Sequence, residues 1–390
     1  MSSIDLLIIG TGPAGTSTAL HLLQQDPSWR SRMVLVDKAV HPREKLCGGG
    51  ITHFGENILS DLGLPFEPTN FEIQEVRLTY GEKWYSFRGD PVFRIVHRAE
   101  FDHWLVKEVE AAGGIVSQGE AVTDVQEHAN YIEVKTDRRT FHAKAIVAAD
   151  GSYSVVRKKL KWSDPKHLSH LIEVLTPETH ETSAEFRENR AVFDFSPMTS
   201  HKLQGYYWDF PSIVDGELRM NRGVFDSRSR PERERANLKQ TLNDAMEERD
   251  RQLDSKKVKG HPIRWMNLRG QYSRERILLA GDAAGADPLF GEGIGVALAY
   301  GKVAAHALTD AFERNDFSFR SYKRRVLTNG VLFSVAVRTA VAGSAYRLKS
   351  RRGFEIGWGI ARFIISLTPW SKPSFKPARP PKQSKRVVSL

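Results

Sequence analysis

The residues of this chain with the clearest chemical meaning lie in two glycine-rich segments far apart. Gly10, Gly12 and Gly15 form a Gly-x-Gly-x-x-Gly pattern near the start, and a second small-residue segment covers residues 281–285. Glycines at this spacing let backbone N–H groups approach a pyrophosphate at a helix N-terminus. Asp37 follows about 20 residues later, where a carboxylate accepts hydrogen bonds from a ribose. The pattern predicts a dinucleotide site.

The flanking residues supply the elements that must position this chemistry. Leu6–Ile9 is an apolar run typical of a buried parallel strand, and Ala14–Gln24 has helical character. Met33–Val36 predicts a second strand that ends at Asp37. Strand, loop, helix, strand and acid in this order predict a Rossmann-like α/β fold.

The second segment indicates which dinucleotide is bound. Arg276–Ala280 predicts a short strand, Gly281 and Asp282 end it, and an Ala-rich helix is expected from about Gly293 to Phe312. A nicotinamide dinucleotide has no need of a second element so far along the chain. An extended FAD needs a carboxylate near its ribityl chain and a helix N-terminus near its pyrimidine, so FAD is the predicted cofactor.

With these segments the chain resembles FAD-dependent oxidoreductases of the p-hydroxybenzoate hydroxylase fold. Ile146–Gly151, followed by Ser154 and Arg157, matches that superfamily's strand and Asp-Gly motif. Val96–Asp102 matches another of its segments, and the arginine there, Arg98, looks like the one that contacts the flavin nucleotide.

Within that superfamily the chain is most similar to the geranylgeranyl reductase family. Residues 45–51 match its Cys-Gly-Gly-Gly signature, Pro288–Ile294 its Pro-x-x-Gly-Glu-Gly-Ile stretch, and Tyr206–Pro211 its Tyr-x-Trp-x-Phe-Pro strand. The glycine pair that the family places after that strand is incomplete, with Asn221–Val224 in its place. The resemblance covers roughly residues 4–310.

The resemblance implies a set of site residues. Cys47, Tyr206 and Trp208 are the expected catalytic residues. The expected FAD-binding residues are Gly10, Gly12, Pro13, Ala14, Gly15, Asp37, Lys38, Cys47, Gly48, Gly49, Gly50, Arg98, Val122, Asp150, Gly281, Asp282, Gly291, Gly293 and Ile294. Cys47 is the single cysteine, which excludes an internal disulfide and a multi-cysteine metal site, and no metal is expected.

The family reduces isoprenoid double bonds, so the resemblance implies addition of a hydride and a proton to a prenyl diphosphate, a prenyl lipid or a prenylated quinone. NADPH or another electron donor would act as a transient reductant. The Tyr206–Pro211 segment is also close to the Trp-x-Trp-x-Ile-Pro signature of flavin-dependent halogenases. A monooxygenase or halogenase acting on an apolar or aromatic small molecule therefore stays open, as does a flavin-binding electron carrier. The oligomeric state is not indicated.

The predicted architecture is a discontinuous FAD-binding domain, an antiparallel-sheet substrate domain and a C-terminal helical region. A charged helix is expected from Glu232 to Gln252. The expected boundaries are residues 1–70, 95–160 and 275–315 for FAD binding, 71–94 and 165–265 for the substrate domain, 316–368 for the helical region and 369–390 for a basic disordered tail.

Positive charge is concentrated at the C-terminal end. Residues 314–390 hold 17 Lys or Arg against two acids, a local +15 in a chain of net +10. Two apolar stretches there, Val331–Ala345 and Gly353–Thr368, are too short or too interrupted for a spanning helix. Basic helices with an apolar face suit an anionic membrane surface, whereas the tail lacks the aromatics of a nucleic-acid site. A helical subdomain that caps the substrate channel with a solvated basic face is the alternative for this region, and both can hold. We expect a cytoplasmic protein, because the first strand leaves no room for a signal peptide, and a peripheral position on the inner face of the membrane stays open.

Overall fold

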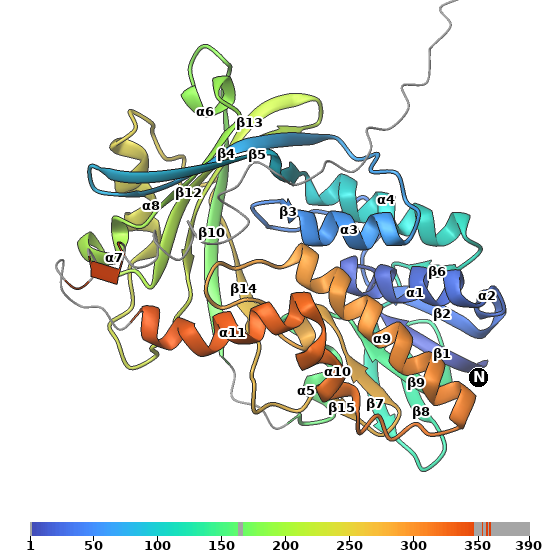
Figure 1. Ribbon diagram of the computed structural model, residues 1–390. Coiled ribbons are helices and arrows are strands. Elements are labelled where there is room, and N and C mark those ends of the chain that lie inside the picture. The colour runs from blue at the N-terminus through green and yellow to red at the C-terminus, as the bar shows by residue number, and fades with distance from the viewer. Residues whose placement is uncertain (1, 163–166, 347–352, 354–355, 358, 360–390) are drawn as a thin grey trace, which may run out of the picture.

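The computed structural model describes residues 2–162, 167–346, 353, 356, 357 and 359. Within these residues the chain forms two eight-stranded sheets that occupy opposite halves of the molecule (Figure 1). The predicted α/β class, with a Rossmann-like domain, a second sheet and C-terminal helices, is confirmed.

The first sheet carries the dinucleotide elements. Its parallel strands follow the order β16-β9-β1-β2-β6, β15 extends one edge, and β8 joins β7 to β9. Leu6–Ile9 in β1 is fully or almost fully buried, as expected for a parallel strand covered on both faces. The strands are β1 (Ser2–Ile9), β2 (Met33–Asp37), β6 (Ile115–Gln118), β7 (Val122–Glu127), β8 (Ile132–Thr136), β9 (Thr140–Ala148), β15 (Ser273–Arg274) and β16 (Ile277–Leu279).

Helices cover this sheet and connect it to the second one. Helix α1 packs against α9, and α3 and α4 lie beside them (Figure 1). The helices of both halves together are α1 (Pro13–Gln25), α2 (Trp29–Arg32), α3 (His53–Asp61), α4 (Arg98–Ala111), α5 (Val155–Lys159), α6 (Ala184–Arg187), α7 (Pro197–Ser200), α8 (Leu238–Glu247), η1 (Gly281–Ala283), α9 (Ile294–Arg314), α10 (Tyr322–Thr328) and α11 (Gly330–Ala345), of which α6, α7 and α8 contact the second sheet.

The second sheet has the order β14-β10-β13-β12-β11-β4-β5-β3. All its pairs are antiparallel except that between β11 and β4, which is parallel and departs from the expected order. These two strands are more than 100 residues apart, so no tight hairpin turn fixes their relative direction. The strands are β3 (Gly50–Thr52), β4 (Asn70–Tyr80), β5 (Lys83–Val96), β10 (Leu168–Pro177), β11 (Arg190–Asp194), β12 (Gly205–Val214), β13 (Glu217–Asp226) and β14 (Lys259–Arg264).

The helix expected over Glu232–Gln252 is shorter than predicted. Helix α8 begins after Asn237, whose side chain accepts a hydrogen bond from Gln240 N–H, and it ends at Glu247. Beyond its end, Asp250 adopts a left-handed conformation with φ of 55°, which cannot continue a helix. The charged residues that suggested a longer helix continue beyond both Asn237 and Asp250, so the charge pattern alone overestimates the length of α8.

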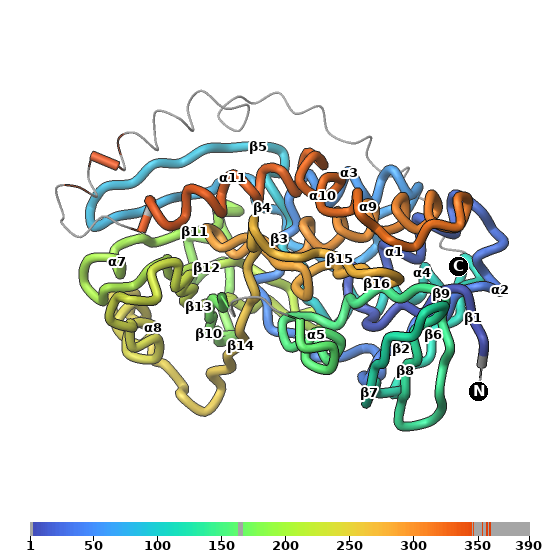
Figure 2. The backbone as a smooth tube through the Cα atoms, turned by 90° about the horizontal axis from the view of Figure 1, so that it is seen from below, coloured from blue at the N-terminus to red at the C-terminus, as the bar shows by residue number. Residues whose placement is uncertain are grey.

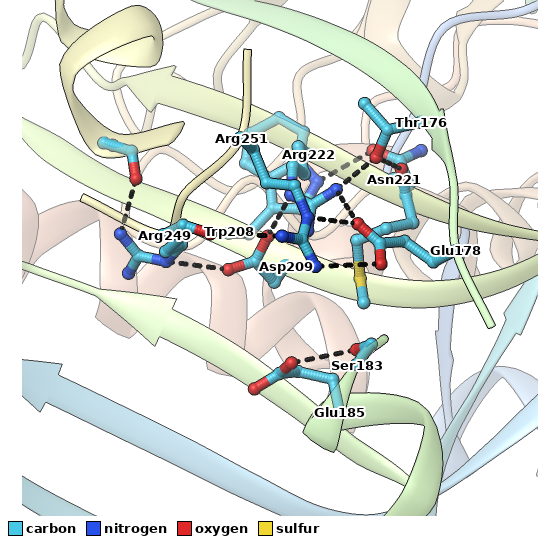
Figure 3. A network of polar contacts seen from close by, with 12 residues as sticks. Thr176, Glu178, Ser183, Glu185, Trp208, Asp209, Asn221, Arg222, Arg249 and Arg251 are labelled. Carbon is cyan, nitrogen blue, oxygen red and sulfur yellow. Dashed lines mark hydrogen bonds and ion pairs between the residues drawn. The ribbon is translucent and has the colours of Figure 1, made fainter. Parts of the chain in front are cut away.

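The face of the second sheet that carries α8 also holds a buried polar network (Figure 3). Arg222 pairs with Asp209 at 2.9 Å and with Glu178 at 2.9 Å. Arg249 reaches Asp209 at 3.0 Å, and Arg251 reaches Glu178 at 2.7 Å. These ion pairs join neighbouring strands on the face opposite the cavity described below.

At the C-terminal end, α10 and α11 run along one side of the molecule together with β5 (Figure 2). Helix α11 coincides with the apolar stretch expected over Val331–Ala345. Most of Gly353–Thr368, and all of the expected tail 369–390, lie outside the described residues. Among the described residues no single helix is long and apolar enough to cross a membrane. Tyr322–Thr328 and Gly330–Ser344 pass such a test only as a pair, bent by 84°.

Candidate active site

One cavity of about 1080 Å³ runs between the two sheets and contains nearly every residue predicted for the site. The exception is Gly15, which packs closely against the loop. A Cβ on Gly15 would lie only 1.9 Å from the Gly10 carbonyl oxygen, so a side chain does not fit there. The predicted residues that line the cavity are Gly10, Gly12, Pro13, Ala14, Asp37, Lys38, Cys47, Gly48, Gly49, Gly50, Arg98, Val122, Asp150, Tyr206, Trp208, Gly281, Asp282, Gly291, Gly293 and Ile294.

The first glycine loop offers backbone donors to this cavity. Gly10 has a φ of 103°, and a Cβ there would lie 2.3 Å from the Ala149 carbonyl oxygen, so only glycine fits. Gly12 caps α1 without a side-chain hydrogen bond, so the N–H groups of Ala14 and Gly15 in the first turn are available to an anion. The residues present therefore fit the pyrophosphate of an extended dinucleotide.

Asp37 lies at the expected end of the cavity, but its carboxylate already holds the loop. Thr11 donates to Asp37 Oδ2 from its N–H and from its hydroxyl, both at 2.8 Å, and Ala39 N–H donates to Oδ1 at 2.9 Å. A carboxylate has about four lone-pair sites, so further acceptor capacity remains for a ribose. Lys38 and Val122 line the same end of the cavity.

A group of basic side chains follows along the cavity. Arg98 donates to Asp102 from Nε and Nη2, both at 2.8 Å, and Arg43 Nη2 donates to the same fully buried carboxylate at 3.0 Å. Lys45 Nζ donates to His261 Nε2 at 2.5 Å. Burial lowers the pKa of Lys45, and it lowers the pKa of His261 to about 4, so this histidine is neutral at pH 7. Arg43 and Arg98 share one carboxylate and Lys45 lines the same cavity, an arrangement that suits the diphosphate charge of FAD.

The second glycine-rich segment meets the first at the middle of the cavity. Asp282 accepts from the Ser152 hydroxyl at 3.2 Å, and Asp150 Oδ2 accepts from Val156 N–H at 3.1 Å. Burial raises the pKa of Asp150. Gly293 caps α9 without a side-chain hydrogen bond, so a second free helix N-terminus faces the cavity. A carboxylate and a helix N-terminus are thus both present where an extended FAD needs them.

The Cys47–Gly50 segment lies between the residues predicted to bind the cofactor and the second sheet. Gly49 N–H donates to Cys47 Sγ at 3.4 Å, and Arg98 also interacts with this thiol. A Cβ on Gly48 would lie 3.0 Å from the Phe210 ring, so this segment packs directly on β12. The structure therefore brings the single cysteine and the aromatic strand to the same place.

Aromatic rings from alternate positions of β12 line the cavity. The ring centroids of Tyr206 and Trp208 are 6.2 Å apart, and those of Trp208 and Phe210 are 6.0 Å apart. Tyr206 donates its hydroxyl hydrogen to the Phe290 carbonyl, and Trp208 Nε1 donates to Asn221 Oδ1 at 2.9 Å. Burial raises the pKa of Tyr206. Both polar tips are therefore engaged with protein, and the rings present an apolar wall.

A buried ion pair fixes the mouth of the cavity. Arg338 on α11 donates to Asp287 at 2.8 Å and pairs with Glu292 at 2.8 Å. Asp287 is fully buried and also accepts from the N–H groups of Leu289 and Phe290. These contacts hold the loop before α9 against α11, which contributes to the cavity lining.

Sequence reasoning missed several residues of this site, and four of them hold other predicted residues in place. Asp102 accepts hydrogen bonds from Arg98 and Arg43, and Glu173 and Asn221 hold the main chain of Cys47. The two acids were not singled out. Asn221 carried a signal, because it stands where the glycine pair was expected.

Comparison with known proteins gives a family and several relatives. A family model described as FAD binding domain matches residues 3–309. An uncharacterised protein of Methanosarcina barkeri is 25% identical over 377 residues, which cover 95% of this chain and 86% of that protein. A digeranylgeranylglycerophospholipid reductase of Methanopyrus kandleri is 26% identical over 345 residues, covering 82% of this chain and 80% of that protein.

Solved structures share the fold. A geranylgeranyl bacteriochlorophyll reductase-like protein of Thermoplasma acidophilum matches with a TM-score of 0.75 at 19% identity, covering 96% of this chain and 94% of that one. The halogenase PltM in complex with FAD matches with a TM-score of 0.69 at 15% identity, covering 88% and 76%. The resemblance to geranylgeranyl reductases that the sequence indicated is confirmed.

Proposed function

Because this chain belongs to the FAD binding domain family and is an FAD-dependent oxidoreductase, we propose that it reduces C=C bonds of an isoprenoid. The substrate would be a prenyl diphosphate, a prenyl lipid or a prenylated quinone. Reduced FAD supplies the hydride equivalent for such a reaction. The first glycine loop, the basic residues and the N-terminus of α9 would hold the cofactor.

The observation that carries this proposal is the apolar character of the aromatic wall. The hydroxyl of Tyr206 and the indole N–H of Trp208 are both taken up by protein acceptors, the Phe290 carbonyl and the Asn221 amide oxygen. A trisubstituted alkene has no group that can form a hydrogen bond, so it must be positioned by the shape of the cavity and by dispersion contacts with the lining side chains. Rings that exclude water and present only carbon suit that task.

The same wall leaves the source of the substrate proton open to three groups. Tyr206 has committed its proton to the Phe290 carbonyl. The Cys47 thiol lines the cavity and can donate a proton. An ordered water in the cavity is the third source. We propose Cys47 as the donor, because Tyr206 and Trp208 already donate to Phe290 and Asn221, whereas the thiol donates to no acceptor within the described part of the chain.

A monooxygenase or halogenase acting on an apolar or aromatic molecule is the alternative, and the fold shared with the halogenase PltM supports it. One experiment separates the two functions. The purified protein, loaded with FAD and reduced without oxygen, is mixed with a prenyl diphosphate, a prenyl lipid or a prenylated quinone. Oxidised-flavin absorbance and substrate mass are then followed together.

Flavin reoxidation with a gain of two hydrogens by the substrate is the result we expect. A flavin that stays reduced until oxygen is admitted, and then reoxidises faster with an organic substrate present, supports the alternative and overturns the reductase. Phe210→Ala should slow the anaerobic step because it removes part of the wall. Val224→Ala, on the opposite face of the same sheet, is the matched control and should not. Addition of NADPH in place of a chemical reductant tests the proposed electron donor.

We also propose that substrate reaches the cavity from an anionic lipid surface on the cytoplasmic side. Phe290, Phe333 and Val337 line the cavity and are nevertheless 41%, 56% and 47% exposed, so they form an apolar lip around its mouth. The basic excess of residues 314–390 provides the complementary charge. Membranes attract this combination of apolar and basic residues.

Sedimentation with vesicles tests this lipid surface. We expect the full chain to bind vesicles that contain phosphatidylglycerol and not vesicles of phosphatidylcholine alone, and Phe333→Ser with Val337→Ser should reduce binding at least fivefold. Equal binding to both vesicle types would contradict the proposal. A stable dimer that the double substitution dissociates would mean that a second copy covers the lip instead.

A further inference from the structure

Side chains from two adjacent strands of the second sheet, β10 and β13, hold the main chain of Cys47, and a side chain from β12 holds one of them. Cys47 N–H donates to Glu173 Oε1 at 3.1 Å, and Asn221 Nδ2 donates to the Cys47 carbonyl at 3.2 Å. Trp208 Nε1 donates to Asn221 Oδ1 at 2.9 Å. Both polar groups of this cysteine's backbone are thus satisfied by side chains 126 and 174 residues away.

The pairing of the strands explains why these three side chains meet. Gly223 on β13 is directly opposite Trp208 on β12 and directly opposite Glu173 on β10. A Cβ on Gly223 would lie 2.3 Å from the indole, so the absent side chain lets the Trp208 ring lie across that strand. Asn221, two residues earlier on the same face, then reaches both the indole and Cys47.

Burying the ionisable side chain of Glu173 costs more free energy than a purely structural hydrogen bond requires. It is 7% exposed, and burial raises its pKa to about 7. The Cys47 N–H, the Asn221 amide and the positive charges of Arg98 on α4 and Lys259 on β14 act in the opposite direction. A glutamine would accept the same hydrogen bond without the penalty of burying an ionisable group. Its second oxygen, Oε2, has no hydrogen-bond partner among the described residues.

We propose that Glu173 and Asn221 are positioning residues, which hold the Cys47–Gly50 segment in the place where the flavin ring and the substrate meet. They touch neither molecule themselves and act through the Cys47 main chain. Only the purpose of this positioning, the reduction of a substrate at the flavin, rests on the proposed function. A hydrogen bond to an ionised acceptor is roughly twice as strong as a neutral one, so the hold strengthens when Glu173 is ionised.

The single cysteine provides a direct readout of this hold. Because Cys47 is the only thiol in the chain, its rate of alkylation by iodoacetamide reports on this segment alone. Glu173→Gln keeps the acceptor and removes the charge, whereas Glu173→Ala removes both. Asn221→Ala releases the Cys47 carbonyl. Val174→Ala is the control, because this side chain is equally buried but packs on the α8 face of the same strand.

We expect Glu173→Ala to be alkylated at least fivefold faster than Glu173→Gln at pH 7.5, and Asn221→Ala to be at least fivefold faster than the control. The control should match the wild type. Rates for both alanine variants within twofold of Val174→Ala would overturn the inference. If Glu173→Ala does not fold, Asn221→Ala alone decides the matter by the same criterion.

A second readout uses the bound cofactor without any substrate. In the FAD-loaded wild type, the flavin absorbance should change with a midpoint near pH 7, where Glu173 ionises. This change should be absent in Glu173→Gln, and a midpoint that persists in that variant would overturn the assignment. Neither readout involves an isoprenoid, so a failure of isoprenoid reduction would refute the proposed function and leave this inference standing.

Discussion

Replacing Gly223 by alanine tests whether the aromatic wall depends on the missing side chain at this position. The new Cβ would lie 2.3 Å from Trp208 Cζ2 and 2.4 Å from the Ile172 carbonyl oxygen. The indole can move, but the carbonyl belongs to the β10 backbone and cannot move without disturbing the pairing of β10 with β13. We expect the substitution to displace the ring and to break its hydrogen bond to Asn221.

The expected cost follows from two terms. Overpacking of a filled interior costs about 1–3 kcal/mol, and both short contacts place this case at the upper end. Loss of the indole hydrogen bond adds about 1 kcal/mol. The free energy of unfolding should therefore fall by about 3–4 kcal/mol, which is more than a hundredfold in the folding equilibrium. Urea denaturation followed by circular dichroism measures this quantity.

Two further variants make the reasoning refutable. Gly343→Ala, within α11, has no atom within 4 Å of the added Cβ, so it should cost nothing and should gain up to about 1 kcal/mol from helix propensity. In a Trp208→Phe background the cost of Gly223→Ala should be smaller by more than about 1 kcal/mol, because the clashing indole carbon is gone. A cost below about 0.5 kcal/mol in the wild-type background, or equal costs in both backgrounds, would show that the indole does not lie across Gly223.

Three other substitutions have distinct expected outcomes. Arg338→Ala leaves Asp287 buried without its cation and should destabilise the fold by about 3–5 kcal/mol in urea denaturation. Burial already raises the pKa of Asp287, so this acid favours folding at low pH, and the deficit should grow as the pH rises through its folded pKa. Tyr206→Phe should lower kcat less than tenfold, because the hydroxyl serves the Phe290 carbonyl, and a hundredfold loss at unchanged stability would instead identify a proton donor. His21 has its pKa lowered to about 4, mainly by burial, so wild-type stability should fall as the pH drops from 6.5 toward 4. His21→Met should make the free energy of unfolding less dependent on pH between 6.5 and 4. An unchanged pH dependence would show that His21 does not cause this loss of stability.

The cofactor-binding half of the molecule was predictable because its signals are local. Gly10, Asp37 and the helix after Gly12 lie within one strand, helix and strand unit, and the order of elements alone places them at one edge of a sheet. The second glycine segment was predictable for the same reason, since Asp282 lies in the turn directly after a strand and Gly293 caps a helix. The proposed domain boundaries stay a prediction.

The contacts that hold the Cys47 segment were not predictable from the chain. Glu173 and Asn221 become neighbours of Cys47 only through the register of β10 and β13, and register depends on pairings between strands that are about 50 residues apart. An acid in the middle of an apolar strand such as Leu171–Leu175 looks like a solvent-facing residue when only the sequence is read. The parallel pairing of β11 with β4 was hidden in the same way.

The two faces of β12 and β13 show how the aromatic rings that line the cavity can be held in fixed positions. On the cavity face, Trp208 uses its N–H to reach Asn221. One residue further along each strand, on the opposite face, Asp209 pairs with Arg222 (Figure 3). Since adjacent residues point to opposite faces, the charged pairs can fix the relative position of the strands without adding polarity to the cavity. The isoprenoid substrate that we propose would offer the protein few groups for hydrogen bonds, so the precision of its site would have to come from contacts behind the aromatic wall.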